Sequence, residues 1–127
     1  MKILNYINNE WIEPNVNAYV DVINPATGHV IAKTPLCGRT EVDAAAQAAL
    51  AAFPAWRATP TQDRVQFLFK LRDLLKGDLD EIGRTITNEC GKTFDEAKAE
   101  MVRAIENVEV AGGMPMMMKG EISEDIA

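Results

Sequence analysis

The spacing of hydrophobic residues changes near residue 40 and divides the chain into two parts. Over residues 1–39, short apolar runs alternate with turn-forming residues, which is typical of β-hairpins. From residue 40 onwards, apolar residues recur at the spacing of one face of an α-helix. The pattern predicts an α+β segment, with two β-hairpins over residues 1–39 followed by four α-helices over residues 40–113.

The hairpin region contains two sets of turn signals. Asn8-Asn9 separates two apolar runs, and asparagine tolerates the positive φ that a tight two-residue turn requires. Farther along, Tyr19–Ile23 and Val30–Thr34 flank the turn formers of Asn24–Gly28. We therefore expect one hairpin around Asn8-Asn9 and a second around Asn24–Gly28.

The first helix has a start signal and a stop signal. Thr40 and Asp43 have the spacing of a capping box for a helix over Val42–Phe53. Pro54 is expected to end this helix, because proline lacks the backbone N–H that a helix interior needs.

The second helix is predicted to begin at Thr59, with Pro60 in its first turn and Gln62 as the capping partner. Its apolar stripe includes Val65, and it is expected to end at Gly77.

The third and fourth helices meet at a glycine. Asp78 and Glu81 predict the start of the third helix, and Gly91 its end, because glycine readily adopts the left-handed conformation of a helix C-terminus. Thr93 and Glu96 then have capping-box spacing for the fourth helix.

The fourth helix is expected to stop at Gly112-Gly113, before Pro115. Residues 114–127 then form a C-terminal tail, in which Met114–Met118 precedes an acidic end. Three consecutive methionines need a surface that buries them, so this tail is interpreted as truncated.

Length and charge narrow the class of protein. A chain of 127 residues is most simply one domain. A net charge of -6 and scattered Lys and Arg residues argue against nucleic acid as a partner. There is no apolar stretch long enough to cross a membrane and no signal-peptide pattern, so we expect no membrane partner and a cytoplasmic location.

Gly91-Lys92-Thr93 resembles the end of a phosphate-binding loop. That motif needs a glycine where this chain has Ile86, and a strand before the loop, whereas Leu79–Cys90 has helical spacing. We interpret the three residues as a helix stop followed by a helix cap, with Lys92 exposed or in a contact between domains.

The remaining candidates for chemistry have structural explanations. Cys90 shares a helical stripe with apolar residues near a helix C-terminus, where a thiolate is disfavoured, so it is expected to be buried, and Cys37 is interpreted likewise. His29 is expected on the surface of a hairpin, and Glu96 and Glu100 on helix caps and solvated faces. The residues themselves therefore predict no catalytic, cofactor-binding or metal-ligating residue.

Several stretches, taken in order, resemble the N-terminal part of the aldehyde dehydrogenase superfamily. They resemble its opening hairpin, its Asn-Pro-x-Thr-Gly hairpin, its first helix with the Trp-Arg that follows, and its Glu-x-Gly-Lys turn. The stretches are Tyr6–Ile12, Ile23–Ala32, Val42–Ala45, Phe53–Arg57 and Glu89–Thr93.

One subfamily is especially similar. Pro54–Pro60, Gly113–Pro115 and Lys119–Glu121 resemble the methylmalonate-semialdehyde dehydrogenases. The resemblance implies an aldehyde-dehydrogenase-like α/β fold. It also implies an activity in which NAD and coenzyme A are used to convert (methyl)malonate semialdehyde to an acyl-CoA with loss of carbon dioxide.

The resemblance further implies that the glycine-rich nicotinamide site, general-base glutamate, nucleophilic cysteine and oxyanion-hole asparagine of the family lie outside this chain. We expect residues 1–127 to be a single N-terminal segment of the NAD-binding domain that binds no cofactor by itself. The alternative is a stand-alone helical interaction module that docks onto itself or onto full-length subunits. Bare apolar faces at Val42–Phe53 and Met114–Met118 predict self-association.

Overall fold

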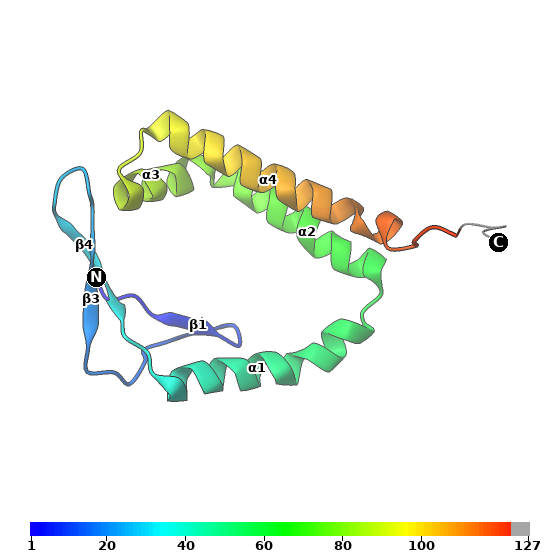
Figure 1. Ribbon diagram of the computed structural model, residues 1–127, viewed down its shortest axis with the longest axis horizontal. Coiled ribbons are helices and arrows are strands. Elements are labelled where there is room, and N and C mark those ends of the chain that lie inside the picture. Colours follow the sequence, from blue (N-terminus) through cyan, green and yellow to red (C-terminus); the bar gives the residue numbers. More distant parts are fainter. Residues whose placement is uncertain (123–127) are drawn as a thin grey trace, which may run out of the picture.

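The computed structural model describes residues 1–122, in which two β-hairpins are followed by four α-helices (Figure 1). This arrangement confirms the predicted fold class. The elements are β1 (Asn5–Ile7), β2 (Glu10–Ile12), β3 (Tyr19–Ile23), β4 (Val30–Pro35), α1 (Arg39–Ala58), α2 (Thr61–Gly77), α3 (Leu79–Cys90) and α4 (Phe94–Met117). The end of the predicted C-terminal tail, beyond residue 122, lies outside the described residues.

The first hairpin turns where the sequence predicts. Asn8 and Asn9 have φ values of 53° and 64°, the positive values of a two-residue hairpin turn. The strands β1 and β2 are antiparallel, with Tyr6 opposite Trp11 and their ring centroids 4.8 Å apart. This aromatic pair stabilises a hairpin that is otherwise only three residues long on each side.

The second hairpin pairs β3 with β4 in antiparallel register, and its turn ends at Gly28, which has a φ of 74°. The N-terminal residues extend this sheet on the other edge of β4. The Ile3 N–H donates to the Lys33 carbonyl at 2.9 Å, and the Lys33 N–H donates to the Met1 carbonyl at 2.8 Å. The predicted hairpin is confirmed, and residues 1–3 lie along the outer edge of β4.

The N-cap of α1 lies two residues before the predicted cap, Thr40, and the helix begins at Arg39 rather than Val42. The N-cap is Gly38, whose N–H donates to the Glu41 carboxylate at 2.8 Å. Asp43, the expected capping partner, instead forms an ion pair with Arg39 at 3.2 Å, one helical turn away. The capping hydrogen bond is therefore made by the Glu41 carboxylate, three residues after the N-cap, and Gly38 contributes only its backbone N–H.

The end of α1 also corrects the prediction, because the helix continues through Pro54 to Ala58. Residues around Pro54 are exposed, so water can bond to the carbonyl that the proline leaves without a donor. The effective stop is Pro60, which excludes the preceding residue from the helical region. Thr59 is extended and caps the end of α1, with its hydroxyl donating to the Ala55 carbonyl at 3.0 Å. It is therefore not the N-cap of α2, a position that Pro60 occupies.

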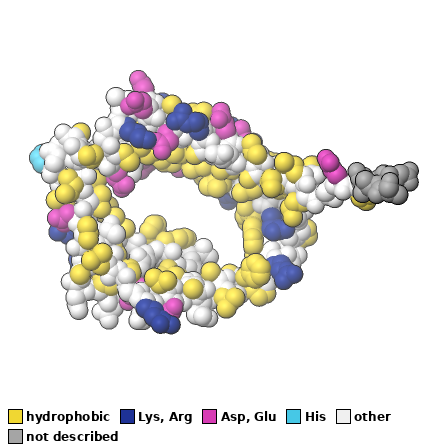
Figure 2. All heavy atoms as spheres, viewed as in Figure 1, with side chains coloured by type: hydrophobic (Ala, Val, Ile, Leu, Met, Phe, Trp, Pro, Cys, Tyr) yellow, Lys and Arg dark blue, Asp and Glu magenta, His cyan; other side chains and the backbone are white. Residues whose placement is uncertain are grey.

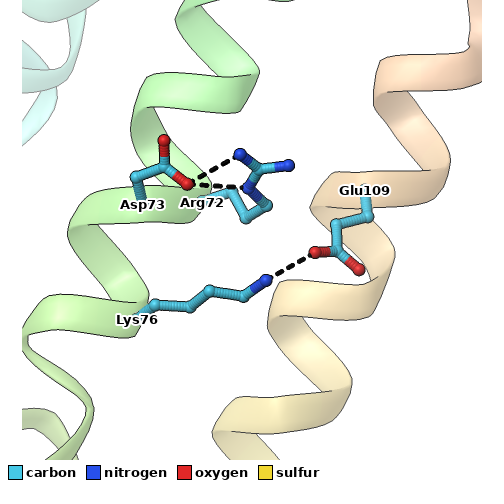
Figure 3. Close-up of polar contacts among 4 residues, drawn as sticks. All are labelled: Arg72, Asp73, Lys76 and Glu109. Atoms are coloured by element: carbon cyan, nitrogen blue, oxygen red, sulfur yellow. Dashed lines mark hydrogen bonds and ion pairs between the residues drawn. The ribbon is translucent and has the colours of Figure 1, made fainter.

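Helices α2 and α4 form the best-packed part of the fold. Val65 of α2 is buried, together with Ala97, Met101 and Ile105 along one face of α4, as the helical spacing predicts. At the edge of this interface the Lys76 ammonium lies 2.8 Å from the Glu109 carboxylate (Figure 3).

Figure 3 also shows Arg72 and Asp73, two adjacent residues of α2 that form an ion pair. Arg72 Nη2 lies 2.7 Å from the carboxylate of the adjacent Asp73, and the guanidinium lies 5.4 Å from the centre of the Phe69 ring. Phe69 faces α4, where it packs against a glycine.

Glycines bring the helices close together. A Cβ on Gly112 of α4 would lie 2.9 Å from the Phe69 ring. A Cβ on Gly83 of α3 would lie 3.1 Å from the ring of Phe94 in α4. Gly112 therefore permits close packing of α2 on α4 and is not a helix stop. The helix predicted to end at Gly112-Gly113 instead continues through Pro115 to Met117, which corrects that prediction.

The elements enclose an open centre (Figure 1). Helix α1 follows one side of this ring, beside the first hairpin, and α2 and α4 follow the other side. Residues Val42, Leu50 and Phe53 of α1 are each more than half exposed, and α1 has no buried residue. Figure 2 shows hydrophobic side chains along the inner edge of the ring, and charged side chains mainly on its outer edge.

Candidate functional site

The turn between α3 and α4 has the geometry of a helix stop. Gly91 has a φ of 70°, and its N–H donates to the Thr87 carbonyl at 2.9 Å. A Cβ on Gly91 would lie 2.9 Å from Cγ of Pro25, in the turn of the second hairpin. The glycine is therefore required both for the left-handed backbone and for the contact between hairpin and helix. The predicted helix stop is confirmed.

Thr93 caps α4 as predicted. Its hydroxyl accepts a hydrogen bond from the Glu96 N–H at 3.3 Å, and its own N–H donates to the Glu96 carboxylate at 3.1 Å. The Thr93 hydroxyl also donates to that carboxylate at 2.8 Å. These bonds from the side chain and backbone of Thr93 lower the pKa of Glu96 below its ordinary value.

Lys92 is held by a carboxylate rather than directed at an open phosphate site. Its ammonium forms an ion pair with Glu100, about two turns into α4. The hydrogen bond raises the pKa of Lys92 and lowers the pKa of Glu100. With Glu96 and Glu100 both at this end of α4, the turn presents negative charge where a phosphate would have to bind. The geometry supports the structural interpretation of Gly91-Lys92-Thr93.

Both cysteines are exposed, so the prediction that they are buried is wrong. Cys90 lies in the last turn of α3, which extends beyond the part of the helix that packs on α4. Cys37 precedes α1, and the side-chain amide of Asn5 donates to its sulfur at 3.3 Å. His29 is exposed in the second hairpin, as predicted. Among residues 1–122 no group of three His, Cys, Asp or Glu side chains is placed to hold a metal ion.

Residues 1–122 do not form a site that fits a dinucleotide. A dinucleotide site needs parallel strands and a glycine-rich turn that leads from a strand into a helix N-terminus. The strands β1–β4 form two antiparallel pairs, and the N-terminal residues add only an isolated parallel bridge at Lys33. The only strand-to-helix connection among residues 1–122, from β4 to α1, places the Glu41 carboxylate at the helix N-terminus. The described residues therefore do not form a phosphate cradle for NAD.

Sequence reasoning missed one feature, a groove at the end of the α2–α4 pair. We call it the α2–α4 groove; its volume is about 230 Å³. Its lining is mainly apolar, with one cationic residue, and includes Trp56, Arg64, Phe67, Ala111, Met114 and Met118. The methionine run was singled out in the sequence as needing a cover, and Met114 and Met116–Met118 are indeed exposed. No sequence signal indicated that Arg64 lies beside them, because the two segments are far apart in the chain.

Comparison with known proteins identifies the family. The sequence profile of the aldehyde dehydrogenase family matches residues 11–126. The chain belongs to this family. The malonate-semialdehyde dehydrogenase of Listeria innocua is 44% identical over 126 residues, which cover 99% of this chain and 26% of that protein. The malonate-semialdehyde dehydrogenase of Bacillus pumilus is 45% identical over 123 residues, covering 97% of this chain and 25% of that protein.

Solved structures agree with the sequence relatives. Methylmalonate-semialdehyde dehydrogenase from Oceanimonas doudoroffii matches with a TM-score of 0.90 at 38% identity, over 100% of this chain and 26% of that chain. A putative methylmalonate-semialdehyde dehydrogenase from Sinorhizobium meliloti, complexed with NAD, matches with a TM-score of 0.91 at 31% identity over the same shares. The predicted resemblance is confirmed, and the chain spans about a quarter of the length of these aldehyde dehydrogenases. Within residues 1–122 no helix is both long and apolar enough to cross a membrane.

Proposed function

We propose that residues 1–127 are the N-terminal scaffold segment of an NAD-dependent dehydrogenase that oxidises malonate semialdehyde or its methyl derivative to an acyl-CoA. The observation that carries the proposal is the match itself, which covers 99% of this chain and only 26% of a malonate-semialdehyde dehydrogenase. In this proposal the segment braces the cofactor domain, and the NAD site, the coenzyme A site and the catalytic residues belong to the rest of the enzyme.

The exposed apolar faces support a scaffold role. Leu50 of α1 is 62% exposed and Phe53 is 52% exposed. Each large apolar side chain left in water forgoes roughly 1.5–3 kcal/mol of burial free energy. A segment whose helices pack on a larger domain would recover this free energy, which an isolated segment cannot do. The two exposed free cysteines suit a reducing compartment such as the cytoplasm.

A chimera tests the proposal directly. In this chimera the present chain replaces the 126 matched residues of the Listeria innocua enzyme. We expect it to fold and to reduce NAD when malonate semialdehyde and coenzyme A are supplied, whereas the isolated chain should produce no NADH above background. An inactive or insoluble chimera, prepared beside an active parent enzyme, would contradict the scaffold function. The DNA that follows the codon of Ala127 gives an independent check, because the proposal requires a reading frame that continues into dinucleotide and cysteine motifs.

The second candidate is an independent module that docks onto itself or onto complete dehydrogenase subunits. The bare face of α1 favours it, because a second copy could cover Val42, Leu50 and Phe53. Sedimentation over a concentration series separates the candidates when combined with the chimera. Self-association of the isolated chain with an inactive chimera favours the module, and an active chimera favours the scaffold.

A further inference from the structure

Helices α1 and α2 meet at a corner and then separate. Only Thr59 and Pro60 lie between the end of α1 and the start of α2. At the corner Trp56 of α1 packs edge-on against Phe67 of α2, with ring centroids 5.6 Å apart. Beyond it the two helices diverge and follow opposite sides of the open centre (Figure 1). A formed contact therefore lies at the apex of an open angle between two helices.

Each helix continues the corner contact with exposed apolar side chains. In α1, Leu50 and Phe53 are both more than half exposed, and they lie six and three residues before Trp56. In α2, Leu71 is 43% exposed and Leu74 is 55% exposed, four and seven residues after the ring of the corner pair. This spacing places the α2 residues on one face of the helix, separate from the face that packs on α4.

The two sets of side chains are in register for antiparallel packing. Counted from the corner pair, Phe53 is three residues away along α1 and Leu71 is four residues away along α2. Their heights above the corner therefore differ by one residue, or about 1.5 Å of helix rise, and the next pair differs by the same amount. Closing the angle would bring these side chains together in turn. We call the three pairs the α1–α2 seam: Trp56–Phe67, Phe53–Leu71 and Leu50–Leu74.

Helix α1 has no charged side chain along the seam. Its charged residues lie at its two ends, and residues 44–56 are uncharged. Closure would therefore bury no charge of α1, and it would remove large apolar side chains from water. Figure 2 shows such hydrophobic side chains along the inner edge of the ring.

We propose that α1 is a hinged strap, which swings about Thr59-Pro60 and transiently closes the α1–α2 seam in the free chain. Closure shields apolar side chains of a segment that has not joined the rest of the enzyme. In the complete dehydrogenase the strap is held open, a clause that rests on the proposed function. The open ring matches the Oceanimonas doudoroffii enzyme with a TM-score of 0.90 over 100% of this chain, which supports that clause.

The open form remains the more populated one in the free chain, because α1 is tethered at both ends. Its N-terminal end follows β4 after only three residues. The turn of the β3–β4 hairpin in turn packs on the helices, where a Cβ on Gly91 would lie 2.9 Å from Cγ of Pro25. A swing of α1 disturbs this contact, and that cost opposes the seam. Leu50 therefore stays exposed most of the time, and the closed form has to be trapped.

Disulfide trapping detects the closed form. Leu50→Cys and Leu74→Cys are combined in the isolated chain, with Cys37→Ser and Cys90→Ser removing the native thiols. The control combines Leu74→Cys with Ala51→Cys, at an exposed residue that points about 100° away from its neighbour around the helix. In a buffer of reduced and oxidised glutathione, the seam pair is expected to form an intrachain disulfide at least roughly tenfold faster than the control pair.

Two charge substitutions test the register of the seam. Phe53→Asp places a carboxylate between the outer and inner pairs, where closure would desolvate it, so the rate of the seam pair should fall to that of the control pair. Val42→Asp introduces the same charge on α1 outside the seam, at a side chain that is also exposed, and should leave the rate unchanged. Equal effects of the two substitutions would contradict the seam.

The outcomes separate this inference from the proposed function. Equal rates for the seam and control pairs in the isolated chain overturn the strap, whatever the activity of the chimera. Disulfides between chains, formed faster as protein concentration rises, identify a second copy as the partner of α1 and also overturn it. In an active chimera the seam pair should react no faster than the control pair. An active chimera that traps the seam as fast as the isolated chain overturns the held-open state, whereas an inactive chimera contradicts the proposed function alone.

Discussion

The two sides of the ring have similar sequence patterns and different environments. Helices α2 and α4 carry apolar residues at helical spacing, and Val65 and Ile105 on those faces are buried. Helix α1 carries the same kind of stripe, yet Val42 and Leu50 remain more than half exposed. Periodicity therefore shows that a face needs a partner, and it does not show where in the protein that partner lies.

The difference follows from where the partner of each helix lies. Helices α2, α3 and α4 are joined by short turns, and both α2 and α3 pack on α4, which lies within the described residues. Within the described residues, α1 lies beside the short first hairpin and does not pack into the layer formed by α2–α4 (Figure 1). In the proposed function its partner is the larger part of the dehydrogenase.

Core substitutions on the two sides give the largest expected contrast. Ile105 of α4 is 4% exposed, so Ile105→Ala should reduce the free energy of unfolding by about 2–4 kcal/mol through lost burial and a cavity. Leu50→Ala, at a position 62% exposed in α1, should change it by less than about 0.5 kcal/mol. Urea unfolding followed by circular dichroism measures both.

In the chimera the losses of unfolding free energy for Ile105→Ala and Leu50→Ala should become more similar, because the rest of the enzyme would cover α1. A loss for Leu50→Ala as large as that for Ile105→Ala in the isolated chain would mean that α1 is already packed in solution. A second copy would then be its partner, and the loss would depend on protein concentration.

The contact between the second hairpin and the helices should be nearly as sensitive. Gly91→Val places a β-branched residue at a φ of 70° and a Cβ 2.9 Å from Pro25, and should cost roughly 1–3 kcal/mol. Lys92→Ala removes only an exposed ion pair and should change the unfolding free energy much less. Thermal melts that show the reverse order would contradict the helix-stop interpretation of the turn.

The features that were predicted from sequence are the local ones. The Asn8-Asn9 turn, the left-handed Gly91 and the capping box of Thr93 with Glu96 are all confirmed, because each depends on residues only a few positions apart. The buried face of α4 followed from periodicity for the same reason. A resemblance carried by several short motifs was enough to identify the family.

The features that were missed depend on tertiary structure. Pro54 was taken as a helix stop, and the fourth helix was expected to end at Gly112-Gly113, before Pro115. Both prolines lie inside helices, because exposure or a neighbouring helix determines whether a missing hydrogen bond can be tolerated. Cys90 was expected in the core because its helical stripe continues beyond the packed region. No sequence signal pointed to Arg64, since the groove that it lines is completed by residues about fifty positions away.

A smaller change in unfolding free energy is expected from substitutions at helix N-caps. The comparison is between the N-cap of α4, Thr93, and the N-cap of α3, Asp78. Thr93 makes side-chain hydrogen bonds at the start of α4, so Thr93→Ala should cost about 1 kcal/mol. Asp78 occupies the N-cap position of α3 and makes no side-chain cap hydrogen bond, so Asp78→Ala should cost less. Urea unfolding of the two variants tests the order, and equal losses would mean that Asp78 caps α3 in solution.

The smallest expected effect is a loss of unfolding free energy at acidic pH, which originates in carboxylates of α4. Hydrogen bonds from Thr93 lower the pKa of Glu96 on folding. A carboxylate with a lowered pKa stabilises the fold above its unfolded pKa, and this contribution is lost as the pH falls through the folded value. For Glu96 the loss therefore begins below the ordinary glutamate pKa of about 4.3.

The Glu100 and Glu109 carboxylates respond with the same sign, because their ion pairs with Lys92 and Lys76 also lower their pKa values. Glu96→Gln should therefore reduce stability at neutral pH and weaken its acid dependence without abolishing it. Unfolding midpoints measured at neutral pH and over a series from about pH 4 downwards supply the test. A wild-type chain and a Glu96→Gln variant that lose stability in parallel below that pH would show that the cap of α4 does not depend on the charge of this carboxylate. The acid response would then belong to the ion pairs that join Lys92 to Glu100 and α2 to α4.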